Sequence, residues 1–310
     1  MNSPDNTLVT IDRCDPLAEK SVLGLAAQAW PEAERAGYWK AISALVRGGQ
    51  ADRVVLLAAR ENDDLVAAQV AQSLPGRAAV VWPPQFAAID ATKRNSLAAL
   101  LFGRLVPELA ATGAHLAQAL LADNDQPAAR LFAMGGFTHA ANLLYLAAEV
   151  NDRPENPPPL PFEIETFTPQ AESRLIQLIE RTYVGTLDCP RIDGLRKTAA
   201  VVAGYQSVGE FRPELWKIAQ HGGADVGCLL VNLHLDVKHA EIVYVGLVPE
   251  VRRRGWGLLL TQLAQWIARQ VSCNRVVLAV DAANEPAIRP YTLAGFSLFD
   301  RRTVWIRSLQ

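Results

Sequence analysis

The ten residues Val248–Gly257, VPEVRRRGWG, place three consecutive arginines before two glycines that flank a tryptophan, and a leucine-rich run follows. An apolar strand pattern precedes this stretch and helical spacing follows it. The first amides of a helix lack intrahelical acceptors, and the helix dipole adds partial positive charge there. Glycine allows positive φ and close ligand approach, while arginine adds fixed charge. The stretch therefore predicts an anion site, with a solvated basic turn as the alternative.

Two other phosphate-binding patterns do not fit this stretch. No GK[ST] follows the glycines, so the stretch is not a P-loop, and the dinucleotide pattern GxGxxG fails at Leu260. Each charge-assisted hydrogen bond to an anion is worth about 1.5–3 kcal/mol. A few such bonds would hold a pyrophosphate.

Composition indicates a soluble globular protein of two ordinary domains. The chain has 310 residues, is 50% hydrophobic and carries a formal net charge of -2, which argues against a protein that coats nucleic acid. No apolar run approaches the roughly 20 residues that span a bilayer, and the start of the sequence shows no secretory signal. We therefore expect a cytoplasmic protein without membrane or nucleic-acid partners, as a monomer or homodimer.

The cysteines and histidines do not suggest a metal site. None of the four cysteines stands in a CxxC pattern, and the nearest histidines, His234 and His239, fit an exposed hairpin. We expect reduced thiols and no metal. The cysteines are Cys14, Cys189, Cys228 and Cys273.

The two halves of the chain contain similar short segments in the same order. Asn151–Pro161 carries five prolines and predicts a semi-rigid linker. A constant shift of 159 residues places Asp125–Phe137 on Asn284–Phe296, and the same shift places Thr92–Leu101 on Val251–Leu260. A constant shift without gaps favours duplication over chance. The sequence thus predicts two domains, 1–150 and 162–310, joined by the linker 151–161.

Each half reads as a strand, two helices, a run of strands, then helix, strand, helix and strand, which predicts a mixed α/β fold with a mixed sheet. In the second half, Asn284 fits an N-cap and Gly295 a helix end. The expected elements there are strands at 162–167, 224–235, 239–248, 275–280 and 300–309, and helices at 170–183, 257–271 and 284–295.

The second half resembles the GNAT acetyltransferase superfamily. Its coenzyme motif, Q/R-x-x-G-x-G/A after a strand, is matched by Arg252, Gly255 and Gly257. Asn284–Phe296 is similar to the second signature of the family, an Asn followed by a helix ending in Tyr-x-x-x-Gly-Phe. The resemblance implies a splayed mixed sheet with acetyl-CoA, as co-substrate, between two strands.

The resemblance also implies residues for the coenzyme. The loop would give amides and charge to the pyrophosphate, the preceding strand would pair with the pantetheine arm, and an amide near Leu247 would polarise the thioester carbonyl. Gly246 suits a bulge or a close backbone approach. The implied coenzyme residues are Gly246, Leu247, Val248, Arg252, Arg253, Arg254, Gly255, Trp256, Gly257 and Asn284.

Two residues are candidates for proton transfer. Tyr291 is the expected general acid, since a phenol of pKa about 10 can protonate a leaving thiolate; a core aromatic is the alternative. Pro290 directly precedes it and is expected to kink the helix. Glu241 stands fourteen residues before Gly255, the spacing of a catalytic glutamate in one branch of the family. A plain surface glutamate, with water as the base, is the alternative.

The acceptor is expected to lie against Thr182–Lys197, which in this fold overhangs the acceptor site. Tyr183, Asp188, Cys189 and Asp193 are the candidate substrate contacts, and the two carboxylates can pair with a cationic amine. As the alternative, Asp193 also fits a helix cap or a turn residue. A covalent role for the cysteine at 189 is not expected, since direct transfer is the usual route of the family.

The first half lacks the residues that would carry this chemistry. Ser96, Ala98 and Phe132 stand where Gly255, Gly257 and Tyr291 stand in the second half, so the first half is interpreted as a degenerate GNAT-like domain. The leading hypothesis is an N-acetyltransferase acting on a primary amine of a small molecule or peptide. The alternatives are an acyl-CoA sensor or assembly subunit without turnover, and transfer of a longer acyl chain.

Overall fold

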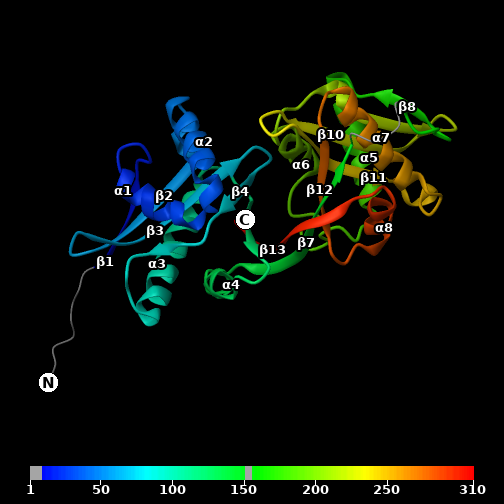
Figure 1. The fold of residues 1–310 in the computed structure, drawn as a ribbon. Coiled ribbons are helices and arrows are strands. Elements are labelled where there is room, and N and C mark those ends of the chain that lie inside the picture. The colour runs from blue at the N-terminus through cyan, green and yellow to red at the C-terminus, as the bar shows by residue number, and fades with distance from the viewer. Residues whose placement is uncertain (1–8, 151–155) are drawn as a thin grey trace. The chain divides into compact units, whose positions relative to one another are not determined.

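The computed structural model describes residues 9–150 and 156–310, so residues 151–155 of the predicted linker lie outside the described residues. The chain forms two compact units (Figure 1). The first contains the described residues up to His139 together with Val304–Gln310, and the second contains Ala140–Thr303. The assignment of one functional domain to each side of the linker stays a prediction.

The first unit has a mixed sheet with the strand order β1-β2-β3-β4-β6, and β5 pairs with β3. Its inner strand β2 begins with a continuous buried run, Val54–Ala59, as expected for a strand covered on both faces. Its elements are β1 (Val9–Cys14), α1 (Lys20–Ala26), α2 (Arg35–Arg47), β2 (Val54–Glu61), β3 (Asp64–Leu74), β4 (Ala78–Val81), β5 (Gln85–Phe86), α3 (Ala91–Ala111), β6 (Leu116–Ala122) and α4 (Gln126–Met134).

The second unit repeats this plan with the strand order β7-β12-β11-β10-β9-β8, and β13 lies beside β7. The mixed α/β class predicted from the sequence is confirmed, and helix α8 ends before Gly295 as expected. The elements are β7 (Thr138–Glu149), β8 (Glu163–Thr166), α5 (Glu172–Tyr183), α6 (Thr198–Gln206), β9 (Lys217–His221), β10 (Ala224–His234), β11 (His239–Leu247), α7 (Trp256–Gln270), β12 (Arg275–Asp281), α8 (Glu285–Leu293) and β13 (Ser297–Ser308). The first two residues of β7 and the last five of β13 belong to the first unit.

Strands β11 and β12 separate along their length. They pair in parallel only from His239 with Arg275 to Glu241 with Val277. Beyond that point β11 continues along β10 as far as Leu247, and β12 continues along β7 as far as Asp281. In the described part of the chain, the two parallel neighbours therefore share a ladder at one end and diverge at the other, as the family resemblance implied.

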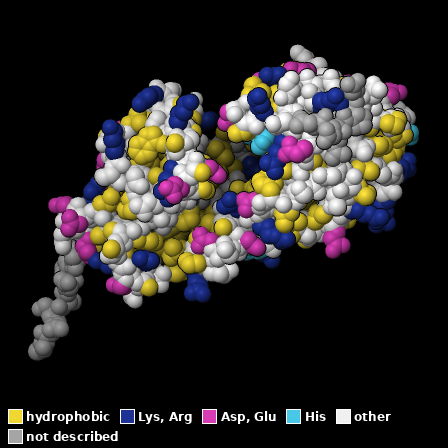
Figure 2. All heavy atoms as spheres, viewed as in Figure 1, with side chains coloured by type: hydrophobic (Ala, Val, Ile, Leu, Met, Phe, Trp, Pro, Cys, Tyr) yellow, Lys and Arg dark blue, Asp and Glu magenta, His cyan; other side chains and the backbone are white. Residues whose placement is uncertain are grey.

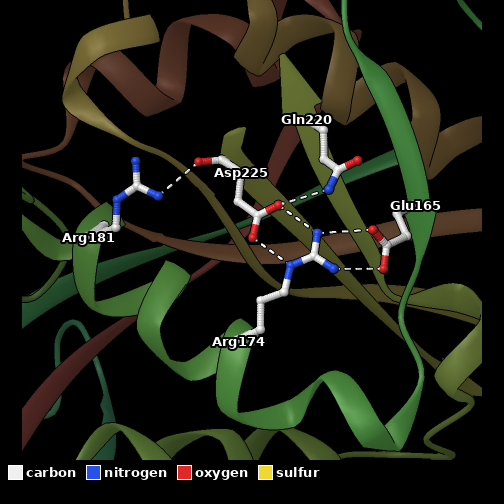
Figure 3. Close-up of polar contacts among 5 residues, drawn as sticks. All are labelled: Glu165, Arg174, Arg181, Gln220 and Asp225. Carbon is white, nitrogen blue, oxygen red and sulfur yellow. Dashed lines mark hydrogen bonds and ion pairs between the residues drawn. The ribbon is translucent and has the colours of Figure 1, made fainter. Parts of the chain in front are cut away.

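Helix α5 is held to the edge of the sheet by an arginine cluster (Figure 3). The guanidinium of Arg174 lies 2.9 Å from a carboxylate oxygen of Glu165 on β8 and 2.6 Å from one of Asp225 on β10. Hydrogen bonds from Arg174 and Gln220 lower the pKa of Asp225 despite its partial burial. Arg181, in the last turn of α5, donates to the backbone carbonyl of Asp225. These contacts fix both ends of α5 against the start of β10, and the first turn also against β8.

The surface carries charges of both signs. On the face drawn in Figure 2, basic and acidic side chains are intermingled. None of the helices in the described residues combines the length and the apolar character needed to cross a membrane.

Candidate active site

The loop between β11 and α7 turns sharply through two residues with positive φ. A short turn forms first, in which Val251 N–H donates to Val248 O and Arg252 N–H donates to Pro249 O, each at 3.2 Å. Arg253 then has φ of 64° and Gly255 has φ of 78°. Helix α7 begins at the next residue, Trp256. Because these two residues are left-handed, the backbone turns, and the amides after Arg252 do not bond to the carbonyls of the preceding turn.

Five consecutive amides in this loop have no protein acceptor. No hydrogen bond within residues 9–150 and 156–310 uses the N–H groups of Arg253–Gly257. The N-cap residue Gly255 has no side chain to cap the helix, and no protein atom lies within 4 Å of where its Cβ would stand. Free amides at a helix N-terminus with open space beside them bind anions. The residues present therefore fit a pyrophosphate group.

The three arginines of the loop do different things. The Arg252 guanidinium donates from Nε to Leu247 O at 3.0 Å and from Nη2 to Thr182 O at 2.8 Å, so its charge is directed into the protein. Arg253 is exposed. Arg254 donates to Glu250 O and lies 5.6 Å from the ring centroid of Trp256. The sequence could predict the positive charge of the loop, but not that one of the three guanidinium groups is engaged by backbone carbonyls.

Trp256 and Gly257 serve the packing of α7. The Trp256 ring is buried, and its centroid lies 4.9 Å from that of Phe162 and 5.1 Å from that of His221. A Cβ at Gly257 would meet only Pro290 of α8, at 3.6 Å. The Trp256 side chain is thus used for packing, and Gly257 has none. Both residues therefore offer a ligand only their backbone amides.

The free edge of β11 presents amides toward the widening gap. Val248 N–H donates to Val226 O at 2.9 Å, so it points toward the neighbour β10. Because N–H directions alternate along a strand, the N–H groups of Leu247 and Val245 point to the opposite edge, where β12 has diverged. This supports the predicted place of the thioester-polarising amide. That role stays a prediction.

Gly246 is required by protein packing. A Cβ there would lie 2.8 Å from both Thr182 Oγ1 and Tyr244 Oη, closer than real side chains allow. The bulge of β11 falls elsewhere, since the register shifts between Leu230 and Val231 and leaves Val243 as the extra residue. The expected close approach at Gly246 is therefore made by α5, and the expected bulge at this position was wrong.

Helix α8 brings Asn284 and Tyr291 to the site. Asn284 is the N-cap residue as predicted, but its side chain makes no capping bond, and Ala287 N–H donates to its backbone oxygen instead. Tyr291 is buried, and burial together with the Asp188 charge raises its pKa above 10. The helix continues through Pro290 to Leu293. Within the described residues the Asn284 carboxamide therefore caps no helix amide, and Tyr291 has a phenol that stays protonated at neutral pH.

Glu241 does not stand alone at the start of the gap. Its Oε2 lies 2.7 Å from His234 Nε2 across β10 and β11, and both side chains are partly exposed. The hydrogen bond to Glu241 raises the pKa of His234 above its ordinary 6.5. His234 was predicted to lie in an exposed hairpin, and its pairing with Glu241 was not predicted. The registers of two adjacent strands, not local sequence, bring the two side chains together. Proton abstraction by Glu241 stays a prediction.

Three tyrosines line the region between α5, α6 and β11. The rings of Tyr205 and Tyr244 stack with centroids 5.5 Å apart, and Tyr183 meets Tyr244 edge-on at 5.8 Å. Burial raises the pKa of all three phenols. Tyr183 was predicted for the acceptor side, whereas Tyr205 and Tyr244 were missed. The alternation of β11 could have indicated Tyr244, because it shares the α5 face with Gly246.

The segment between α5 and α6 reaches the end of β12. Asp188 Oδ1 accepts from Asp281 N–H at 3.1 Å, and Asp281 Oδ2 accepts from Cys189 N–H at 3.2 Å. Surrounding protein raises the pKa of Asp188, the Asp281 N–H bond opposes this, and the Asp281 carboxylate adds to the rise. Asp193 is exposed and lies in a turn four residues before Lys197, the N-cap of α6, so of the two alternatives it is a turn residue and not a helix cap. Asp281 was missed, although it directly ends a buried strand.

A splayed pair of parallel strands followed by an open amide loop is the arrangement of acyl-CoA-dependent acetyltransferases, and the comparisons agree with it. Residues 173–296 match the family model described as the acetyltransferase (GNAT) family. The match lies within the second unit, which is thus similar to the GNAT family over most of its length.

Curated relatives are mycothiol acetyltransferases. The protein of Corynebacterium aurimucosum is 33% identical over 103 residues, which are 30% of this chain and 33% of that protein. The protein of Thermobispora bispora is 29% identical over 205 residues, which are 64% of this chain and 68% of that protein. The first match thus spans about a third of the relative's length. The second is longer than either half of the chain and supports a shared tandem layout.

Solved structures share the fold across the chain. A GCN5-related N-acetyltransferase from Sphaerobacter thermophilus aligns with a TM-score of 0.62 at 18% identity, covering 100% of this chain and 98% of that one. A tandem GNAT protein from the clavulanic acid biosynthesis pathway aligns with a TM-score of 0.54 at 13% identity, covering 98% and 99%. Both alignments take in the two halves, which fits two GNAT-like domains.

Proposed function

We propose that the second unit binds acetyl-CoA and transfers its acetyl group to a primary amine of a small molecule or peptide. The observation that carries the proposal is the run of five backbone amides, Arg253–Gly257, that has no acceptor in the described chain and opens to free space. The GNAT family match and the name of the curated relatives, mycothiol acetyltransferase, support acetyl transfer. The four cysteines are free thiols, which agrees with a cytoplasmic location.

The groups of the chain divide the chemistry among them. Bound acetyl-CoA supplies a thioester whose C–S bond breaks as the C–N bond to the amine forms. An amide on the free edge of β11, from Leu247 or Val245, donates to the thioester oxygen. Tyr291 gives its proton to the departing sulfur, and Glu241, directly or through water, removes the proton of the amine. Asn284 offers its carboxamide to the coenzyme.

Coenzyme binding and amine turnover test the proposal in two stages. Calorimetry with acetyl-CoA is expected to show saturable binding to one site. Release of free CoA thiol is then expected to depend on an added amine, with glucosamine, cysteine and an unblocked dipeptide as first probes. Binding without amine-dependent release across a wide amine panel would support the non-catalytic acyl-CoA sensor. Absence of acetyl-CoA binding would contradict the proposal itself.

A further inference from the structure

The segment between α5 and α6, Val184–Lys197, is tied to the last residue of each diverging strand. One tie runs through Arg252 and joins Thr182, two residues before the segment, to Leu247, where β11 ends. The other joins its middle to Asp281, where β12 ends. Both ties lie within the second unit, so the segment bridges the open end of the gap between the two strands. We call it the bridging segment.

The first tie is made by Arg252. Its Nη2 donates to Thr182 O at 2.8 Å, and its Nε donates to Leu247 O at 3.0 Å. Thr182 O belongs to the last turn of α5, where carbonyls have no intrahelical partner and a cation is favourable. Two different N–H groups of one planar guanidinium meet two different carbonyls, which a lysine could not reproduce. Arg252 therefore fixes the start of the bridging segment relative to the coenzyme loop.

The second tie is reciprocal. Asp281 N–H donates to Asp188, and the Asp281 carboxylate accepts from Cys189 N–H and from Ala283 N–H. The Asp281 side chain is buried, and Cys189 has φ of 45°, a backbone state that needs such support. Neutralising Asp281 weakens both bonds that its carboxylate accepts. Asp281 therefore fixes the middle of the bridging segment relative to α8.

The groups predicted for the acceptor lie on the same stretch. Tyr183 stands at the end of α5, directly before the bridging segment, and Asp188 stands within it. Asp281, which ends β12, is bonded to this segment, and α8 with the proposed general acid Tyr291 begins four residues later. The position of the segment therefore decides where an amine can approach the acid.

We propose that Arg252 and Asp281 are positioning residues that hold the bridging segment across the ends of β11 and β12 and so set the approach of the acceptor amine. The inference rests on the proposed function in that it assumes an acceptor amine. The two ties themselves exist without any ligand. Arg252 acts through Thr182 and Leu247 rather than by contact with a phosphate. Asp281 acts through Cys189 and Asp188.

Hydrogen exchange and kinetics together test the inference. In Arg252→Lys, Arg252→Gln and Asp281→Asn, amides of residues 184–189 in the ligand-free protein are expected to exchange about tenfold faster. The acetyl-CoA Kd should stay within about threefold of its original value. The KM for the best amine probe should rise by about tenfold or more, with a smaller change in kcat. Arg94→Gln and Asp123→Asn, at exposed positions of the first unit, serve as controls and should change none of these values.

The outcomes separate the inference from the proposed function. Unchanged exchange of residues 184–189 in all three variants would overturn the ties, and so would a tenfold loss of acetyl-CoA affinity in Arg252→Lys without faster exchange. If the unaltered protein fails to bind acetyl-CoA, the proposed function fails, while the exchange measurement still decides whether the ties hold the segment. If Arg252→Gln does not fold, Arg252→Lys and Asp281→Asn carry the test.

Discussion

The helix that follows the diverging strands begins differently in the two units. In the second unit, α7 begins at Trp256 after a glycine without a side chain. In the first unit, α3 begins at Ala91, and the Asp90 carboxylate accepts from Lys93 N–H at 2.9 Å. Under the 159-residue shift, Trp256 corresponds to Leu97, so α3 starts six residues earlier (97 − 91). The amides that lie open in the second unit are thus inside a helix in the first.

The last helices of the two units differ in the same way. Asp125 caps α4 by accepting from Ala128 N–H at 3.1 Å, whereas the corresponding Asn284 of α8 makes no side-chain cap. A carboxylate at a helix start occupies the amides and repels a phosphate. We infer that the first unit does not hold the coenzyme, and that a few residues at two helix starts decide this within one fold.

The aromatic position of this last helix shows what remains alike. Phe132 is buried against Phe102 and Phe137, with centroids 5.2 and 5.0 Å away, and Tyr291 lies 5.9 Å from Phe296. Both rings serve packing, and only Tyr291 adds a hydroxyl. The difference between the units at this position is one oxygen atom.

Gly255→Val is expected to have the largest effect. The residue has φ of 78°, which a β-branched side chain does not tolerate, so the loop must rearrange and close the amide site. Acetyl-CoA affinity measured by calorimetry should fall by about 100-fold or more. Ser96→Val, at the matching place inside α3, should leave the affinity unchanged. Unaltered binding by Gly255→Val would contradict the amide site.

Tyr291→Phe is expected to lower kcat by about tenfold or more, because the departing sulfur loses its proton donor. Acetyl-CoA affinity should change little, since the ring remains. Phe132→Leu in the first unit serves as the control and should leave kcat as it is. Full activity of Tyr291→Phe would reject the assignment of the acid.

The pH dependence sharpens the assignment of Tyr291. An acid acts in its protonated form, so its contribution is present below its pKa and is lost as pH rises through that value. Burial and Asp188 raise the pKa of Tyr291 above 10. We therefore expect that loss of the Tyr291 proton does not lower kcat between pH 8 and pH 10. Any decline of kcat in that range should persist in Tyr291→Phe. Such a decline, removed by the substitution, would contradict the high pKa.

Asn284→Asp would make the second unit resemble the first at α8. The new carboxylate should accept from Ala287 N–H, as Asp125 does from Ala128 N–H, and stabilise the helix by up to about 1 kcal/mol. Its charge should weaken acetyl-CoA binding by about fivefold. The melting temperature should rise and the acetyl-CoA affinity measured by calorimetry should fall, and both are measured on the same sample. A gain in affinity would break the comparison.

Asp90→Ala is expected to have the smallest effect. Loss of the cap on α3 should lower the free energy of unfolding by about 1 kcal/mol, measured by urea denaturation. Acetyl-CoA binding should not change, because the matching amides remain inside α3. If the substitution created a second coenzyme site, the cap alone would explain the difference between the units.

The sequence predicted the parts of this site that depend on local backbone chemistry. The strand, glycine and helix order around Gly255 and the end of α8 before Gly295 follow from spacing and residue type. The early start of α3 could also have been predicted, because Asp90 is a good N-cap and Thr92–Leu97 contains no glycine. The 159-residue shift compares residue types position by position and does not show where each helix begins.

The contacts that could not be predicted join residues far apart in the chain. Asp281 and Cys189 are 92 residues apart, and Arg252 and Thr182 are 70 apart. A sequence shows the charge of an arginine but not which carbonyls its long side chain reaches. The pair of His234 and Glu241 likewise depends on the register of β10 against β11.

Amide chemical shifts on addition of acetyl-CoA test the central claim most directly. The account predicts that the largest changes fall on Arg253–Gly257, since these amides gain an acceptor they lack in the free protein, while Arg94–Ala98 in α3 shift little. Saturation of the protein with acetyl-CoA while the amides of Arg253–Gly257 keep their positions would contradict it.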